Sequence, residues 1–448
     1  MMAAGSGLAA LLFAGACSPP PSAVVTSPMT KGSPSSYGVG VITDTFVDTS
    51  RTTAAWGPSP DRPSRTLVTA IFYPSGPPGA RPVSGRAPDR TGAPYPLIVF
   101  AHGLGAAPDD YQKLLVSWAS AGYVVAAPRF PLSSTATPGG PDGGDVVNQP
   151  EDMSFVISSV LQATAATSGP LSGLVDPHEI GAAGHSNGAI TTLGLVANTC
   201  CHDSRVKAAV VMAGTTEGFP SGEYDFSNAP PLLLVHGTAD ELVPYRSGVL
   251  VFNEARGPKG LLTIRGGSHG AAAGLSPPSS ATVILSSTEF FDAYLLHQAA
   301  AAKRLAGQGR PGGTVLTFDP MAGSAAGLPL PPAPVAHLQA SVTPATGLSD
   351  GETVTVQWSG YTPGGVVNVL QCSTVDLTSA SSAGCDFSNA KILHPDPKGN
   401  GSLTLEVVTG IVGNGVCDAT HPGCSIVVNN SSSTDPSASR QLPISFAP

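Results

Sequence analysis

The sequence predicts an α/β domain built on a mostly parallel sheet with helices on both faces, followed by a smaller all-β sandwich. Three observations support this prediction. Short apolar runs rich in β-branched residues alternate with segments of helical spacing as far as about residue 298. A Pro-rich stretch follows, and beyond it strand-like alternation continues without a helical period. A chain of 448 residues also has the length of two or three ordinary domains.

The elements of the first domain can be assigned in chain order. Strands are expected at 66–73, 96–101, 123–127, 179–183, 206–212, 232–235 and 261–264. Helices are expected at 109–120, 151–163, 189–197 and 288–297. Because the strands are almost continuously apolar, both faces of their sheet should be covered by helices.

The N-terminus has the features of an export signal. A short apolar run, Leu8–Ala16, ends in small residues before Cys17, and it is too short to span a bilayer. Residues 14–17 also resemble a bacterial lipobox, in which the cysteine is lipidated. We therefore expect a signal peptide at 1–17 and an exported protein that is either secreted or anchored to the cell surface. Residues 18–36, rich in Pro, Ser and Thr, are expected to be a flexible linker.

The remaining boundaries follow from changes in pattern. We expect the α/β domain at 37–298, a linker with at most one short strand at 299–336, and the sandwich at 337–448. The net charge of -9 leaves no basic face for nucleic acid. No zinc-type cysteine spacing and no HxH or HExxH spacing is present, so we expect neither a metal nor another cofactor. The oligomeric state cannot be inferred from these features.

The segment 184–188, Gly-His-Ser-Asn-Gly, matches the G-x-S-x-G pattern and lies between an expected strand and an expected helix. Flanking glycines permit the sharp turn that raises a serine above the sheet edge, and the helix directs its first amides at a developing oxyanion. The alternative is an incidental Gly/Ser turn, but the flanking elements favour Ser186 as a nucleophile.

A nucleophilic serine needs a histidine as base and a carboxylate to orient it. In chain order, Asp240 follows the buried strand 232–235, and His269 follows the next strand. We expect Asp240 to be the acid, with an N-cap role as its alternative and Glu241 as a weaker rival. We expect His269 to be the base.

The oxyanion should be bound by two backbone amides, those of Asn187 after the nucleophile and Leu104 in the loop after the strand 96–101. His102 and His236 each follow a strand and precede glycine, so we expect them to bond the backbone in tight turns. The Gly- and Pro-rich loop 131–150 is a candidate border of the acyl pocket.

The runs Pro-Leu-Ile-Val-Phe-Ala-His-Gly-Leu-Gly at 96–105, Gly-Tyr-Val-Val-Ala at 122–126 and the motif at 184–188 resemble one esterase branch of the α/β-hydrolase fold. That branch includes platelet-activating-factor acetylhydrolases, chlorophyllases, bacterial cutinases and dienelactone-hydrolase-like proteins. The resemblance covers about residues 37–298. It implies hydrolysis of carboxylic esters through an acyl-enzyme, with the matching residues Ser186, Asp240, His269, Leu104 and Asn187.

The C-terminal segment 340–351, with the strand after it and Gln371-Cys372, resembles the neocarzinostatin family of secreted, immunoglobulin-like sandwiches. The resemblance implies two local disulfides, Cys372 with Cys385 and Cys417 with Cys424. The ligand of this domain stays open, as does the state of the adjacent cysteines Cys200 and Cys201, which could form a vicinal disulfide or remain thiols.

The sequence therefore predicts an exported serine esterase acting on a small-molecule, lipid or polyester substrate. Two alternatives remain open at this stage. The same triad could serve a peptidase or a thioesterase, because the elbow does not define the leaving group. Alternatively, a non-catalytic protein could capture a small molecule through its C-terminal sandwich.

Overall fold

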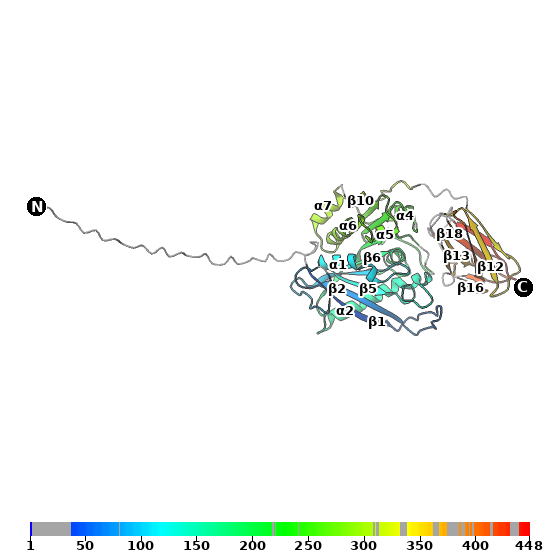
Figure 1. Ribbon diagram of the computed structural model, residues 1–448, viewed down its shortest axis with the longest axis horizontal. Coiled ribbons are helices and arrows are strands. Elements are labelled where there is room, and N and C mark those ends of the chain that lie inside the picture. The colour runs from blue at the N-terminus through cyan, green and yellow to red at the C-terminus, as the bar shows by residue number, and fades with distance from the viewer. Residues whose placement is uncertain are drawn as a thin grey trace.

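The computed structural model describes Met1 and residues 37–448, except for residues 80, 217–218, 220, 241, 308–309, 311–312, 332–337, 362–366, 374–384, 387–389, 394, 397, 413–414 and 431–438. The expected signal peptide, Cys17, the linker 18–36 and Glu241 lie outside the described residues. In Figure 1 the larger domain, coloured blue to yellow-green, lies beside the smaller β-domain that ends in red.

A ten-stranded sheet organises the larger domain, with the strand order β10-β9-β8-β7-β6-β4-β5-β2-β1-β3. Strands β4 to β9 run parallel, whereas β2 and β10 are antiparallel to their neighbours β5 and β9. The strands are β1 (Val39–Asp48), β2 (Arg65–Pro74), β3 (Val83–Ser84), β4 (Tyr95–Ala101), β5 (Val124–Arg129), β6 (Val175–His185), β7 (Val206–Met212), β8 (Leu232–Gly237), β9 (Lys259–Ile264) and β10 (Thr314–Asp319).

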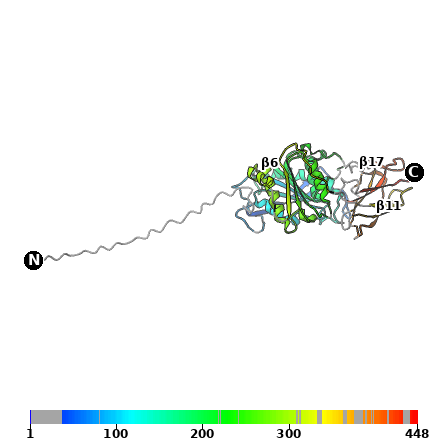
Figure 2. The ribbon, with the colours of Figure 1, turned by 90° about the horizontal axis from the view of Figure 1, so that it is seen from above.

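Helices cover both faces of this sheet, as Figures 1 and 2 show from two directions. The helices are α1 (Gln112–Ser120), α2 (Gln149–Ala165), α3 (Asn187–Ala197), α4 (Tyr245–Glu254), α5 (His269–Ala272), α6 (Ser279–Tyr294) and α7 (Ala299–Ala306). Short 3-10 turns add η1 (Pro108–Tyr111), η2 (Gly144–Asn148) and η3 (Phe226–Asn228). The predicted α/β architecture is confirmed.

Two apolar layers enclose the sheet because alternate residues of each strand point to opposite faces. In β4, Leu97 and Val99 join the layer under α2, α3 and α4, whereas Ile98 and Phe100 join the layer under α1, α6 and α7. All four side chains are fully buried. The apolar runs of the sequence are therefore strands with two buried faces.

The segment expected as a linker contains two elements of the larger domain. Helix α7 packs on α6, and β10 pairs with β9 from Thr314↔Ile264 to Asp319↔Lys259. The α/β domain thus extends past residue 298. The stretch after β10 also lies on α4, since Asn253 exchanges two hydrogen bonds with the backbone of Leu328, at 2.7 and 3.0 Å.

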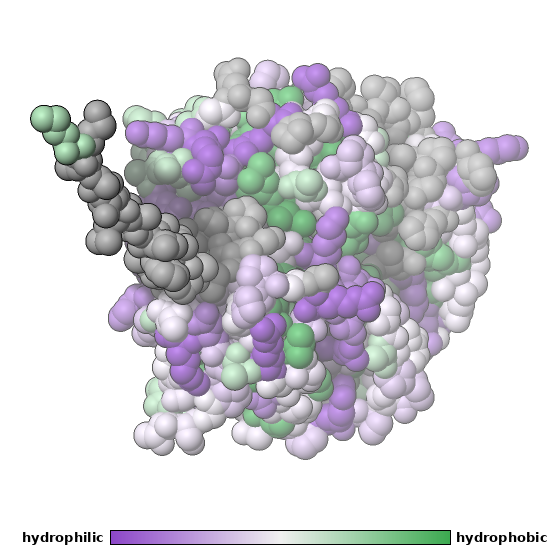
Figure 3. Space-filling model, turned by 60° about the vertical axis from the view of Figure 1, so that its left-hand side comes forward, coloured by the Kyte–Doolittle hydropathy of each residue, from purple (hydrophilic) through white to green (hydrophobic). Residues whose placement is uncertain are grey.

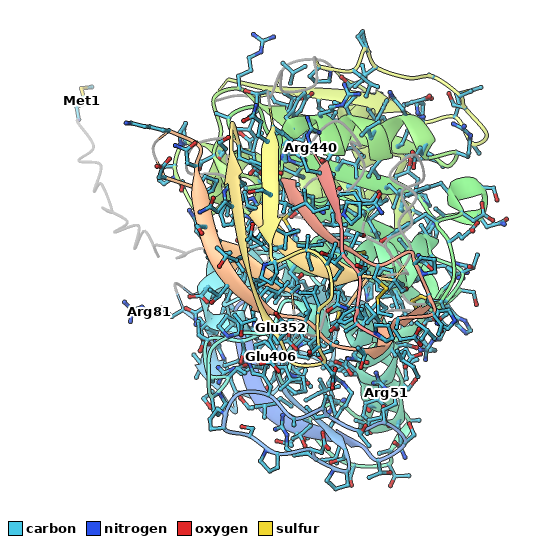
Figure 4. All side chains as sticks on the ribbon, turned by 90° about the vertical axis from the view of Figure 1, so that its right-hand side faces the viewer. Met1, Arg51, Arg81, Glu352, Glu406 and Arg440 are labelled. Atoms are coloured by element: carbon cyan, nitrogen blue, oxygen red, sulfur yellow. A yellow bond between two sulfur atoms is a disulfide. The ribbon has the colours of Figure 1, made fainter. Side chains whose placement is uncertain are left out.

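The C-terminal domain is an all-β sandwich, as predicted. One sheet has the order β11-β12-β15 and the other β14-β13-β18-β19, with the hairpin β16-β17 beside them. Its strands are β11 (Gln339–Thr343), β12 (Thr353–Ser359), β13 (Val367–Cys372), β14 (Lys391–Leu393), β15 (Gly401–Glu406), β16 (Gly410–Val412), β17 (Gly415–Cys417), β18 (Ser425–Asn430) and β19 (Ser439–Pro443). In Figure 4 the sandwich faces the viewer, with Arg440 toward one end and Glu352 and Glu406 toward the other.

Disulfides join Cys372 to Cys385 and Cys417 to Cys424, the pairs that the neocarzinostatin resemblance implies. Cys417 and Cys424 belong to the core that includes Val356, Trp358 and Val369, whereas Cys372 and Cys385 form a smaller cluster with Leu370 and Val427. In the larger domain the adjacent cysteines Cys200 and Cys201 are paired as a vicinal disulfide.

Candidate active site

A sharp turn joins β6 to α3 and places Ser186 at its tip. Ser186 has φ 57° and ψ -122°, a conformation that L-residues adopt only under constraint. The constraint comes from close packing, since a Cβ at Gly184 would collide with Gly188 O, and one at Gly188 with Ala101 O. The turn therefore requires both glycines, and it leaves Ser186 partly exposed at the end of the sheet.

The loop after β4 lies beside this turn, because a Cβ at Gly103 would be 3.4 Å from the Cβ of Ser186. In this loop, the backbone amides of the two residues that flank Leu104 both donate hydrogen bonds within the protein. The amide of Gly103 donates to Tyr111 Oη at 3.1 Å, and that of Gly105 donates to Ser133 O at 2.9 Å. The carbonyl oxygen of Gly103 accepts from His102 Nδ1 at 2.8 Å.

These bonds determine which way the Leu104 amide points. His102 Nε2 accepts the amide of Phe130 at 3.1 Å, so the proton of this imidazole is on Nδ1, which donates to Gly103 O. In a trans peptide the N–H points opposite to the C=O. The amide of Leu104 is therefore turned away from His102, and His102 has the backbone-bonding role predicted for it.

Asp240 and His269 are in direct contact. Asp240 follows β8, His269 begins α5 after β9, and His269 Nδ1 is 3.0 Å from each carboxylate oxygen of Asp240. Asp240 Oδ1 also accepts the amides of Leu242 and Val243 at 2.9 and 2.8 Å. Asp240 thus contacts the histidine and also closes its own turn. It does not have the N-cap role considered as its alternative, because the N-cap of the next helix, α4, is Pro244.

The Asp240 carboxylate is charged although its side chain is fully buried. Burial by itself would raise its pKa, but hydrogen bonds from His236 and His269 outweigh that effect and hold the pKa well below the ordinary value. His236 Nε2 is 2.8 Å from Val243 O and 3.5 Å from Asp240 Oδ2. As predicted, His236 bonds the backbone of its turn.

His269 also contacts the elbow through His185, the residue before Ser186. The two imidazole rings are 4.7 Å apart between centroids, and His185 Nε2 is 3.2 Å from His269 O. The structure therefore gathers Ser186, Asp240, His269, Leu104 and Asn187 at the carboxyl ends of the parallel strands. Sequence reasoning missed Tyr111 and His185, although His185 stands inside the motif that identified Ser186.

The loop 131–150 is anchored beside α3. Gln149 donates to Ser133 Oγ at 2.7 Å and accepts from Thr191 Oγ1, on α3, at 2.6 Å. Val146 packs with Ile190 and Phe219 in a small apolar cluster that includes the vicinal disulfide at its edge. This cluster lies along α3, the helix that follows Ser186.

Within the described part of the chain, no group of three or more His, Cys, Asp or Glu side chains could hold a metal ion. A search of the same residues found no helix long and apolar enough to cross a membrane. The face of the larger domain in Figure 3 is mostly polar, with small separate apolar areas.

Two protein families match different parts of the chain: residues 67–216 match chlorophyllase, and residues 340–446 match the neocarzinostatin family. The α/β domain thus contains a segment similar to chlorophyllase, and the C-terminal sandwich is similar to the neocarzinostatin family. The chlorophyllase-like match includes the loop of Leu104 and the elbow of Ser186, whereas Asp240 and His269 lie beyond it.

Individual relatives match shorter segments. Macromomycin from Streptomyces macromomyceticus is 43% identical over 67 residues, which are 15% of this chain and 44% of that protein. Platelet-activating factor acetylhydrolase from Canis lupus familiaris is 50% identical over 46 residues, which are 10% of each protein. The chain thus spans less than half the length of either relative.

Among solved structures, a ferulic acid esterase from Streptomyces cinnamoneus is 23% identical, with a TM-score of 0.47. The similarity covers 66% of this chain and 98% of that one.

Proposed function

We propose that the protein hydrolyses carboxylic esters through an acyl-enzyme, with Ser186 as nucleophile. The observation that carries the proposal is the contact of His269 Nδ1 with both oxygens of Asp240, at 3.0 Å, beside an elbow that holds Ser186 at positive φ. The chlorophyllase-like match and the acetylhydrolase relative support an ester as the substrate.

In the first half-reaction, Ser186 Oγ attacks the ester carbonyl carbon while His269 Nε2 takes the hydroxyl proton. The amides of Leu104 and Asn187 stabilise the oxyanion that forms. When the tetrahedral intermediate collapses, the ester C–O bond breaks and His269 returns the proton to the leaving alcohol. Water then repeats these steps on the acyl-enzyme and releases the acid.

Asp240 has two effects on His269. Because the Asp240 carboxylate accepts from Nδ1, it selects the tautomer whose Nε2 can act as base. Its negative charge also stabilises the imidazolium that forms when His269 is protonated. The lowered pKa of Asp240 means that the charge persists through the pH range in which a histidine base works.

The substrate is proposed to be a small-molecule, lipid or polyester ester. The loop 131–150 is proposed to border the acyl or aromatic group, because its residue Val146 packs on Ile190 of the helix that follows the elbow. The disulfides and the neocarzinostatin-like domain support export, because such bonds persist in oxidising compartments. Lipid attachment at Cys17 is part of the same proposal and rests on the sequence alone.

The test compares p-nitrophenyl esters of increasing acyl length with a matched thioester and a matched anilide. We expect ester hydrolysis by the wild type, its loss in Ser186→Ala, and no change in the control Ser117→Ala, which alters a partly exposed serine of α1. Faster cleavage of the anilide would favour a peptidase, and faster cleavage of the thioester a thioesterase. Hydrolysis of none by a folded wild type would instead favour a ligand-binding protein.

A further inference from the structure

A buried chain of hydrogen bonds runs beside the elbow through Tyr111 and His185. The amide of Gly103 donates to Tyr111 Oη at 3.1 Å, Tyr111 Oη lies 2.9 Å from His185 Nδ1, and His185 Nε2 lies 3.2 Å from the carbonyl oxygen of His269. The residues Tyr111 and His185 are 2% and 4% exposed. The chain thus connects the oxyanion loop with the backbone of the proposed base.

The chemistry of the partners fixes the direction of every bond. A carbonyl oxygen only accepts, so His185 Nε2 carries the proton and Nδ1 is the acceptor. Tyr111 therefore donates its hydroxyl proton to His185 and accepts from Gly103. Burial, followed by the charge of His269, lowers the pKa of His185 to about 3, and burial raises the pKa of Tyr111 to about 12. Both side chains stay neutral near pH 7, and the direction persists.

These hydrogen bonds restrict two backbone segments that the reaction depends on, the peptide that carries the Leu104 amide and the backbone of His269. Tyr111 holds the amide of Gly103 while His102 holds its carbonyl oxygen, so the following peptide, which carries the Leu104 amide, has little freedom to rotate. At the other end of these hydrogen bonds, His185, which directly precedes Ser186 in sequence, donates to the carbonyl oxygen of His269.

We propose that Tyr111 and His185 are positioning residues that fix the Leu104 amide and the backbone of His269 relative to Ser186. The inference rests on the proposed function, since it concerns the same reaction. Both side chains act through the backbone groups that they hold, and the His185 ring also packs on the His269 ring, with centroids 4.7 Å apart. Losing their bonds should misdirect a donor needed in the transition state more than it weakens substrate binding.

The first test is Tyr111→Phe, which removes one oxygen atom and keeps the ring. We expect kcat for a p-nitrophenyl ester to fall about 10- to 100-fold with little change in KM, less than the loss of a whole oxyanion donor. The affinity of a trifluoromethyl ketone, which forms the oxyanion, should fall by the same factor as kcat. The matched control is Tyr73→Phe, because Tyr73 is 1% exposed and donates to Arg86 O at 2.8 Å. Its kcat should not change.

The second test compares His185→Gln with His185→Leu. Glutamine can accept from Tyr111 and donate to His269 O, whereas leucine can do neither. We expect the Gln variant to keep more kcat and more ketone affinity than the Leu variant. Thermal unfolding measurements show which variants are folded. If a variant in one of the two tests fails to fold, the other test is sufficient to decide the proposal.

The outcomes separate this inference from the proposed function. Wild-type kcat and ketone affinity in Tyr111→Phe, or equal kcat in the Gln and Leu variants, would overturn the positioning role while ester hydrolysis still depended on Ser186. Ester hydrolysis that persists in Ser186→Ala would instead overturn the proposed function.

Discussion

Replacing Arg65 by methionine should destabilise the larger domain. The Arg65 side chain is 1% exposed and lies between two carboxylates whose side chains are fully buried. Its guanidinium donates to Asp145 at 2.9 and 3.0 Å and to Asp152 at 2.7 and 2.6 Å. These bonds attach η2, in the loop 131–150, and α2 to the start of β2.

The expected size of the effect follows from what each carboxylate retains. Asp152 keeps a hydrogen bond from Arg51 Nη2 at 2.7 Å, whereas Asp145 keeps one from the uncharged Asn148 side chain at 3.0 Å. Arg51, labelled in Figure 4, is itself only partly buried. Breaking a buried ion pair by removing one partner costs about 3–5 kcal/mol, and we expect Arg65→Met to lie in this range.

The free energy of unfolding is measured from urea titrations that follow the larger domain. The matched control is Arg256→Met, which removes an exposed guanidinium and should change stability by less than about 0.5 kcal/mol. Adding Asp145→Asn to Arg65→Met should recover part of the loss, because it removes the charge left unpaired. A loss below about 1 kcal/mol in Arg65→Met, or no recovery in the double variant, would refute the reasoning.

Two further predictions concern buried carboxylates. Burial raises the pKa of Asp292 from the ordinary 3.8 to about 7. The contribution of Asp292 to stability is therefore complete below about pH 3.8 and is lost as the pH rises through about 7. The total loss is about 4 kcal/mol. Asp292→Asn keeps an acceptor for Tyr123 but cannot ionise. Its free energy of unfolding, measured in urea titrations, should therefore increase relative to that of the wild type as the pH is raised from about 5 to about 8.5. The same difference in unfolding free energy at both pH values would contradict this prediction. Asp240→Asn can keep the hydrogen bonds from the amides of its turn, but it faces His269 with an NH₂ group. In the ester assay kcat should therefore fall about 10⁴-fold, with the fold retained. A loss of kcat below about tenfold would argue against Asp240 as the acid.

Much of the architecture could be predicted because the central strands are buried on both faces and their apolar runs are uninterrupted. The missed elements gave weaker signals. β1 is half exposed, so its pattern lacks a clean period. The alanines of α7 and the Gly-rich approach to β10 have the composition of a linker, although pairing with β9 makes a strand of Thr314–Asp319. α6 begins at Ser279, earlier than expected, because serine and threonine at its start obscure the helical pattern.

In the candidate site, some residues could likewise be predicted from the sequence and others could not. Ser186 could be found from a local motif, and Asp240 and His269 from their positions after consecutive strands. Contacts between distant residues leave no such signal. Tyr111 and His185 are 74 positions apart, and Arg65 is 80 and 87 positions from its two carboxylates. Only the fold brings these side chains together, so a single sequence could not show their roles.

The most direct test of the central claim is fluorophosphonate labelling, with the modified residue located by mass spectrometry. We predict one label per chain, attached to Ser186, no label in Ser186→Ala, and much slower labelling in Asp240→Asn. A folded wild type that takes no label, or a label on a different serine, would contradict the account of Ser186 as the nucleophile.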